Sequence, residues 1–174
     1  MLRYSKEFSI DILKSFECGI LALDDFIHCS LASFLKEDSR YTFHLVTDEE
    51  RGIVALVITS TGIFVDRDGE YDILPAGKPW GYLDEELHIH SGTMYPTIEI
   101  DFLAIRKDLR GKGYGTMIIS DISISAKRKG YYFLTVDAYH DQDYSAIPFY
   151  EKQGFFALQA FSDDYDTLRM AKRV

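Results

Sequence analysis

The stretch that decides the fold is Arg110–Thr116, which reads Arg-Gly-Lys-Gly-Tyr-Gly-Thr. It follows Thr97–Ile105, an apolar segment that predicts a strand. Directly after it, apolar residues recur at helical spacing and predict an amphipathic helix that ends at Gly130. The residues on that helical face are Ile118, Ile119, Ile122 and Ala126. The sequence therefore predicts a strand, a glycine-rich turn and a helix in direct succession.

Such a succession can bind an anion. Glycines let backbone N–H groups approach phosphate oxygens, and the start of a helix adds partial positive charge. Arg110 and Lys112 add two full charges. The turn is not a Walker A motif, because no Gly-Lys-Ser/Thr ending follows, and it lacks the final step of the dinucleotide-binding fingerprint. Taken alone, it fits a tight connection equally well.

The rest of the chain predicts an α+β protein with a mixed sheet. One amphipathic helix is expected between Leu23 and Leu35, and a second over Ser145–Gln153 with Ser145 as its cap. Five glycines and three prolines interrupt residues 61–96, so we expect a long connection there, bordering a substrate site, within a single domain over 1–174. Strands are expected at Phe8–Leu13, Thr42–Thr47, Gly52–Thr59, Tyr132–Asp137, Phe155–Phe161 and Thr167–Ala171.

Charge is distributed unevenly. The formal net charge is −9, which argues against a general nucleic-acid binder. Residues 61–101 hold nine acidic and two basic side chains, whereas residues 106–130 hold seven basic and two acidic ones. A phosphate ligand at the cationic segment and a cationic substrate nearby would fit this distribution, as would a solvated charged face.

A second motif lies further along the chain, at Ala146–Phe155: Ala-Ile-Pro-Phe-Tyr-Glu-Lys-Gln-Gly-Phe. Together with Arg110–Gly115 it resembles the GCN5-related N-acetyltransferase (GNAT) superfamily, whose loop reads Arg/Gln-x-x-Gly-x-Gly/Ala. The resemblance covers roughly residues 40–170 and departs at Asp143, where the family usually has Asn. It implies a GNAT-like, mostly antiparallel sheet flanked by helices and acetyl-CoA as the acetyl donor.

The resemblance also implies roles for individual residues. The backbone of Leu103, Ala104 and Ile105 would pair with the pantetheine arm of acetyl-CoA, as an added strand does. Tyr150 would protonate the leaving thiolate, although a tyrosine beside Phe149 also fits simple core packing. The pyrophosphate would contact the loop that comprises Arg110, Gly111, Lys112, Gly113, Tyr114, Gly115 and Thr116, and Asp143 would contact the cofactor.

Acetyl transfer to an amine needs a base, because an ammonium group is not a nucleophile. Glu99 lies eleven residues before Arg110, where histone-type members of the superfamily have a glutamate base. Strand alternation puts Glu99 and Asp101 on one face, so Asp101 is the second candidate. His88 and His90 lack a third metal ligand, so no metal site is expected.

The N-terminal sequence is similar to that of toxin-type acetyltransferases, which acetylate the amino group of aminoacyl-tRNA. The matching segments are Ser15–Gly19, Ser-Phe-Glu-Cys-Gly, and Leu23–Ile27, Leu-Asp-Asp-Phe-Ile. Such a toxin would have an antitoxin partner. A net charge of −9 disfavours tRNA, so the preferred acceptor at this point is a primary amine of a small molecule or protein. A non-catalytic acyl-CoA-binding fold is a third alternative.

Partners and location follow from the same observations. Homodimers are common in the superfamily, so a homodimer is compatible with the resemblance. The longest apolar run has six residues, Ile53–Ile58, against the roughly 20 that a membrane-spanning helix needs. The N-terminal sequence has no signal-peptide pattern, so we expect a cytoplasmic protein. Cys18 and Cys29 are expected to be small buried side chains, with no disulfide between them.

Overall fold

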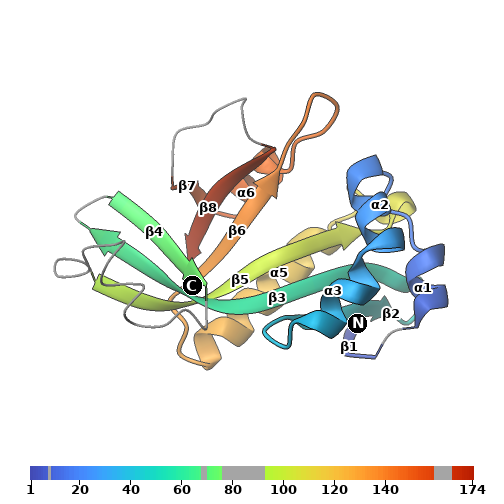
Figure 1. Ribbon diagram of the computed structural model, residues 1–174, viewed down its shortest axis with the longest axis horizontal. Helices are drawn as coiled ribbons and strands as arrows, with labels where there is room; N and C mark the ends of the chain where they lie inside the picture. The colour runs from blue at the N-terminus through green and yellow to red at the C-terminus, as the bar shows by residue number, and fades with distance from the viewer. Residues whose placement is uncertain (8, 68–69, 76–92, 159–165) are drawn as a thin grey trace. The chain divides into compact units, whose positions relative to one another are not determined.

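The computed structural model describes residues 1–7, 9–67, 70–75, 93–158 and 166–174 (Figure 1). The chain forms two compact units, 1–60 with 100–120, and 61–99 with 121–174. In chain order the elements are β1 (Leu2–Ser5), α1 (Ile10–Ser15), α2 (Leu21–Cys29), α3 (Leu31–Glu37), β2 (Thr42–Asp48), β3 (Gly52–Arg67), β4 (Glu70–Pro75), β5 (Thr93–Ile105), the 3-10 turn η2 (Lys107–Leu109), α5 (Tyr114–Arg128), β6 (Phe133–Tyr139), α6 (Ile147–Lys152), β7 (Phe156–Ala157) and β8 (Thr167–Arg173).

The first unit contains four strands in the order β1-β2-β3-β5. β1 and β2 pair antiparallel, as do β2 and β3, with Phe43 opposite Ile58 and Leu45 opposite Leu56. These four side chains belong to the core cluster of the unit. The rest of the cluster comes from α1, α2, α3, the segment between α1 and α2, and β5; its members are Leu13, Ile27, Leu31, Phe16, Cys18 and Ala104.

The prediction of a strand at Phe8–Leu13 is wrong for the part that the structure describes, because α1 begins at Ile10. Ser9 is the N-cap residue, and its Oγ accepts the N–H of Ile12 at 3.2 Å. This capping bond satisfies a donor that the first helical turn leaves without a partner, and so favours a helix over a short strand. Leu13 is the buried residue of α1.

The single helix expected between Leu23 and Leu35 is two helices, α2 and α3, which meet at Ser30. The N–H of Ser30 donates to the Phe26 carbonyl and ends α2, while the Ser30 carbonyl accepts the N–H of Phe34 and begins α3. Ile27 and Leu31 are fully buried on either side of the break. The apolar spacing was read correctly, but it does not reveal a one-residue break.

The second unit contains strands in the order β3-β5-β6-β8-β7, with β4 on β3. β6 and β8 pair antiparallel over their full length, and β7 pairs with β8 in the same sense. Phe64 is buried and stacks on Phe133 with ring centroids 4.1 Å apart. The α+β class with a mixed, mostly antiparallel sheet flanked by helices is confirmed.

The prediction of a long connection over residues 61–96 is wrong for the part of that range that the structure describes. β3 continues to Arg67, β4 occupies Glu70–Pro75, and β5 begins at Thr93. The apolar residues Ile63–Val65 extend β3 past the break that its glycines had suggested, and β4 pairs with this part in antiparallel register. Residues 68–69 and 76–92 lie outside the described residues, together with His88 and His90.

Two smaller expectations also change. α6 begins at Ile147 after Ala146, so Ser145 is not its cap; the Ser145 Oγ accepts the Ile147 N–H at 3.3 Å. The strand expected at Phe155–Phe161 is the two-residue β7, and residues 159–161 are outside the described part. Among the described residues, no helix is long and apolar enough to cross a membrane.

The burial of Leu31 in α3 gives a test of the core cluster of the first unit. Replacing Leu31, which has no exposed surface, with alanine should lower the free energy of unfolding by about 2–5 kcal/mol, because the cavity is not refilled. The matched control is Leu21→Ala, since Leu21 is 78% exposed and its truncation should change stability by about 0.5 kcal/mol or less. Urea titration of both variants measures the difference, and equal stabilities would contradict this core.

Candidate functional site

The glycine-rich turn has an unusual backbone. Gly111 and Gly113 have φ angles of 70° and 87°, in the left-handed region that favours glycine. A Cβ added at either residue would meet no atom within 4 Å. The turn therefore presents open space beside two backbone positions, which is what the close approach of a phosphate group requires.

The start of α5 supplies hydrogen-bond donors beside this space. The Met117 N–H donates to the Gly113 carbonyl at 3.1 Å and is the first bond of the helical pattern. The N–H groups of Tyr114, Gly115 and Thr116 come before that bond, so the helix itself offers them no acceptor. An anion at this end would satisfy these donors and would be stabilised by the helix dipole. The loop residues therefore fit the pyrophosphate of acetyl-CoA.

Arg106 fixes the strand that leads into the turn. Its backbone N–H donates to the Val54 carbonyl at 2.9 Å, and its Nη1 donates to the Ile53 carbonyl at 2.6 Å. A salt bridge from its Nε to Asp108, at 2.6 Å, orients the guanidinium. Leu103, Ala104 and Ile105 end β5 just before this anchor, and β5 is the last strand in the order of the first unit.

The N-terminal segment 16–19 also contacts the approach to the turn, which sequence reasoning missed. The Lys107 N–H donates to the Glu17 carbonyl at 2.8 Å, and Arg110 Nη1 donates to the Cys18 carbonyl at 3.3 Å. The φ of Gly19 is 77°, and a Cβ there would lie 2.9 Å from the Lys107 side chain. The Phe-Glu-Cys-Gly pattern is the signal that pointed to this segment, without showing what it contacts.

Asp24 holds that segment in shape. Its two carboxylate oxygens accept the N–H groups of Cys18 at 2.7 Å and Gly19 at 2.9 Å. Burial acts to raise the pKa of Asp24, but these hydrogen bonds outweigh it and the pKa is lowered. Burial raises the pKa of the Cys18 thiol to about 12, so this cysteine stays a protonated, unreactive core side chain. Cys29 is exposed, contrary to expectation.

In the second unit, α6 holds Tyr150 in a buried position. The side chain is 5% exposed and lies between the rings of Phe149 and Phe155, with centroids 5.0 Å and 5.2 Å away. Burial raises the pKa of Tyr150 well above its ordinary value. The phenol thus stays protonated through the physiological range, as a proton donor must before it acts. Packing and proton donation are both compatible with this environment.

Glu99 lies in the same unit on β5 and is largely buried, with 14% of its side chain exposed. Arg169 Nη2 lies 3.7 Å from Glu99 Oε1, and Arg169 also forms a salt bridge with Asp137. Burial is the main reason that the pKa of Glu99 is raised; Arg169 opposes this increase and Asp137 adds to it. A carboxylate whose pKa is raised is better suited to accept a proton.

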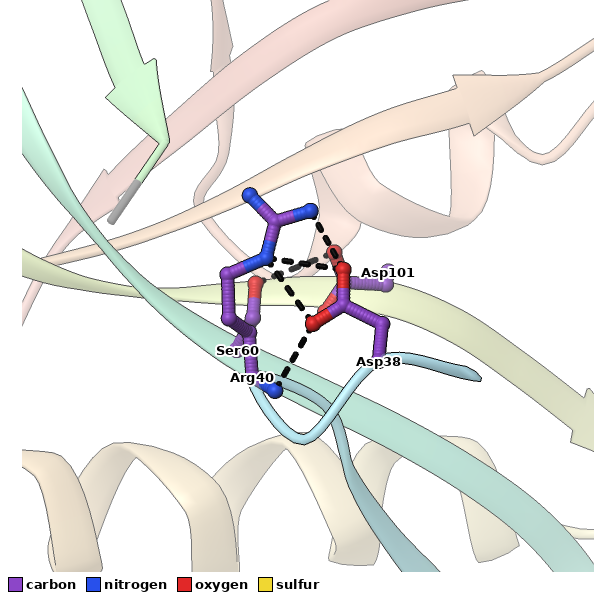
Figure 2. A network of polar contacts seen from close by, with 4 residues as sticks. All are labelled: Asp38, Arg40, Ser60 and Asp101. Atoms are coloured by element: carbon purple, nitrogen blue, oxygen red, sulfur yellow. Dashed lines mark hydrogen bonds and ion pairs between the residues drawn. The ribbon is translucent and has the colours of Figure 1, made fainter. Parts of the chain in front are cut away.

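Asp101, the second candidate base, belongs to the first unit and is exposed. Its Oδ1 accepts the hydroxyl of Ser60 at 3.1 Å (Figure 2). Arg40 lies beside this pair and binds the Asp38 carboxylate through its Nε at 2.8 Å. Hydrogen bonds from Arg40 lower the pKa of Asp38. Asp101 is thus exposed beside this polar cluster, whereas Glu99 is largely buried.

Asp143 is exposed in the turn that precedes α6. Its N–H donates to Asp141 Oδ1 at 2.8 Å, and the Tyr144 N–H donates to the same oxygen at 2.7 Å. Asp141 therefore shapes the turn, while the Asp143 side chain is exposed to solvent. The predicted residues thus separate into the loop with the end of β5, in the first unit, and Tyr150, Glu99 and Asp143, in the second.

The loop geometry leads to a prediction about acetyl-CoA, the donor that the resemblance implies. Gly113→Val should weaken acetyl-CoA binding by at least about tenfold, or about 1.4 kcal/mol, because the side chain occupies the phosphate space and valine disfavours a positive φ. Arg110→Glu should do the same by adding an anion.

The control for backbone strain is Gly130→Val, because Gly130 has a φ of 82° and lies outside the loop. This variant should bind acetyl-CoA as the parent does. Calorimetry on folded protein measures all three affinities, and parent-like binding by Gly113→Val would contradict the loop assignment.

Solved structures of toxins have a similar fold. The toxin AtaT bound to the C-terminus of the antitoxin AtaR and acetyl-CoA, as a Tyr-to-Phe mutant, has a TM-score of 0.62 and 18% identity, covering 99% of this chain and 92% of that one. A Tyr-to-Phe mutant of KacT has a TM-score of 0.59 and 20% identity, covering 97% and 93%. AtaT complexed with acetyl-methionyl-tRNAfMet has a TM-score of 0.58 and 17% identity, covering 97% and 94%.

The sequence also matches a family directly. Residues 20–155, which include the glycine loop, Glu99 and Tyr150, match the Acetyltransferase (GNAT) family. The match spans most of the chain, and one of the similar toxin structures is bound to acetyl-CoA. The chain therefore belongs to the GNAT acetyltransferase family.

Proposed function

We propose that the protein transfers the acetyl group of acetyl-CoA to a primary amine, and that this amine is the amino group of an aminoacyl-tRNA. The main support for acetyl transfer is the geometry of the loop, where two glycines in the left-handed conformation border open space beside the first N–H groups of α5. These groups suit the diphosphate of the donor. Tyr150 and Glu99 supply the proton donor and the proton acceptor that the reaction needs.

The two residues act in successive steps of the reaction. Glu99 accepts a proton from the ammonium group, directly or through a water, so that the nitrogen gains a free electron pair. The amine nitrogen then bonds to the acetyl carbon, and the bond from that carbon to sulfur breaks. Tyr150 donates its phenolic proton to the departing thiolate. The acetylated nitrogen loses its second proton, which passes through water to the Tyr150 phenolate, and Glu99 releases its proton to solvent.

Similarity to toxins supports aminoacyl-tRNA as the acceptor. The similarity extends over 97–99% of this chain and thus includes the N-terminal helices as well as the catalytic motifs. One of these toxins is complexed with acetyl-methionyl-tRNAfMet, and another structure holds an antitoxin segment. By this analogy the protein would have an antitoxin partner. The charge of segment 106–130 suits tRNA phosphates, and we place the protein in the cytoplasm.

Charge favours a second candidate, a free cationic amine such as a polyamine or an exposed lysine. The net charge of −9 attracts such an acceptor and repels the tRNA backbone over much of the surface. Of the acidic groups that suggested this acceptor, Glu99 and Asp101 are described, whereas residues 84–86 lie outside the described part. The two candidates differ in product, so one experiment separates them.

That experiment combines expression with product analysis. We expect expression of the parent to arrest growth, and purified protein with acetyl-CoA to convert methionyl-tRNA into the N-acetyl form seen by mass spectrometry. Spermidine and an unblocked lysine peptide serve as competing acceptors under the same conditions. Normal growth, unmodified aminoacyl-tRNA and rapid acetylation of spermidine would replace the tRNA proposal with the cationic-amine one.

The role of Tyr150 has its own test. Tyr150→Phe keeps the ring between Phe149 and Phe155 and removes the proton donor, so kcat should fall by about tenfold or more while the affinity for acetyl-CoA is retained. Tyr132→Phe is the control, because Tyr132 is 50% exposed and outside α6. Steady-state kinetics and calorimetry separate the two effects. Parent-like kcat in Tyr150→Phe would leave Tyr150 with a packing role alone.

A further inference from the structure

Three charged side chains from neighbouring strands of the second unit lie together, and one of them is the proposed base, Glu99. Glu99 is on β5, Asp137 on β6 and Arg169 on β8, and the strand order of the unit is β5-β6-β8. Asp137 and Arg169 are directly opposite each other in the antiparallel register. The sheet therefore sets this arrangement through backbone pairing rather than through a mobile loop.

Arg169 is shared between two carboxylates. Its Nε donates to Asp137 Oδ1 and its Nη2 to Asp137 Oδ2, both at 2.7 Å. The same Nη2 lies 3.7 Å from Glu99 Oε1. A two-pronged arginine–carboxylate pair fixes the plane of the guanidinium. Asp137 thus holds Arg169 in place, and Arg169 in turn faces Glu99.

The pair with Asp137 is the tighter one, which matters for catalysis. If Arg169 bound Glu99 with two short hydrogen bonds, the carboxylate would be neutralised and poorly able to accept a proton. At 3.7 Å the attraction is present but weaker, and Asp137 offsets part of the arginine charge. The cluster carries two carboxylates and one guanidinium, so it retains a net negative charge that suits an approaching ammonium group.

We propose that Arg169 and Asp137 are positioning residues that together orient the Glu99 carboxylate and keep it available to take the proton of the acceptor amine. This inference rests on the proposed function, in which Glu99 is the base. Neither residue touches the acetyl donor in the proposed reaction; both act through Glu99.

The electrostatic directions make the two residues distinguishable. Burial raises the pKa of Glu99 most, Arg169 lowers it, and Asp137 raises it. In the part of the chain that the structure describes, Arg169 on β8 and Asp137 on β6 are the charged side chains that act on Glu99. On β3, the other neighbour of β5, residues 61–65 hold no titratable side chain. Removing Arg169 should therefore raise the pKa of Glu99, and removing Asp137 should lower it.

The experiment uses four variants of the full chain: Arg169→Gln, Asp137→Asn, Arg169→Lys and Glu99→Gln. Carbon-13 NMR of glutamate-labelled protein gives the pKa of Glu99 directly, with Glu99→Gln identifying its resonance. In parallel, kcat/KM is measured from about pH 5.5 to about pH 9 with acetyl-CoA and either methionyl-tRNA or spermidine, whichever the parent acetylates faster.

We expect opposite shifts. Because only the deprotonated carboxylate accepts a proton, Arg169→Gln should move the acidic limb of the kcat/KM profile to higher pH and reduce kcat/KM at pH 6 by about threefold or more. Asp137→Asn should move the limb to lower pH. Arg169→Lys keeps the positive charge without the two-pronged geometry, and should restore part of the loss. The affinity for acetyl-CoA should stay at the parent value in all four variants.

Each contrary result is informative. A Glu99 pKa that does not move in opposite directions in the two variants overturns the inference, even if the enzyme is active. Opposite NMR shifts with unchanged pH profiles also overturn it, because Glu99 would not be the group that the reaction uses. If the parent acetylates neither acceptor, the proposed function fails on its own, and NMR still decides whether Arg169 and Asp137 control the charge of Glu99.

Discussion

The donor side of this protein depends on one backbone constraint, the left-handed conformation of Gly111 and Gly113 immediately before α5. Any residue with a Cβ would be strained at these positions, and that conformation leaves the space beside the turn open. The other contacts of the turn maintain this arrangement: Arg106 fastens the end of β5 to Ile53 and Val54, and the N-terminal segment receives hydrogen bonds from Lys107 and Arg110. A phosphate group is the ligand that these features suit together.

β5 contributes residues to both units, and it carries both candidate bases. Strand alternation puts Glu99 and Asp101 on the same face of β5, but their surroundings differ. Glu99 is largely buried in the second unit beside a shared arginine, whereas Asp101 is exposed in the first unit and accepts a hydroxyl from Ser60. Burial raises the pKa of Glu99, which is why we propose Glu99 rather than Asp101 as the base.

The sequence predicted those features that local chemistry determines. The loop, α5 and the strands β2, β6 and β8 follow from glycine positions and from apolar periodicity, and the family match of residues 20–155 confirms the resemblance. Prediction from the sequence failed where a single hydrogen bond or a distant strand partner determines the secondary structure. Ser9 turns an apolar segment into α1, Ser30 divides one helix into two, and pairing with β4 extends β3. The cluster of Glu99 with Arg169 joins residues 70 positions apart, which no local pattern reveals.

Charge then constrains how the two substrates are recognised. The acidic excess is largest over residues 61–101, while the cationic segment 106–130 includes the loop and continues through α5. In the proposed reaction a polyanionic donor would meet the cationic segment, and the acceptor amine would meet a cluster with one carboxylate in excess. A tRNA acceptor would have to satisfy both conditions at once, with its amino group at the acidic cluster and its phosphates at the basic segment. Because salt screens charge over distance, the charges at these two places would act on such an acceptor more strongly than the net charge of −9 suggests.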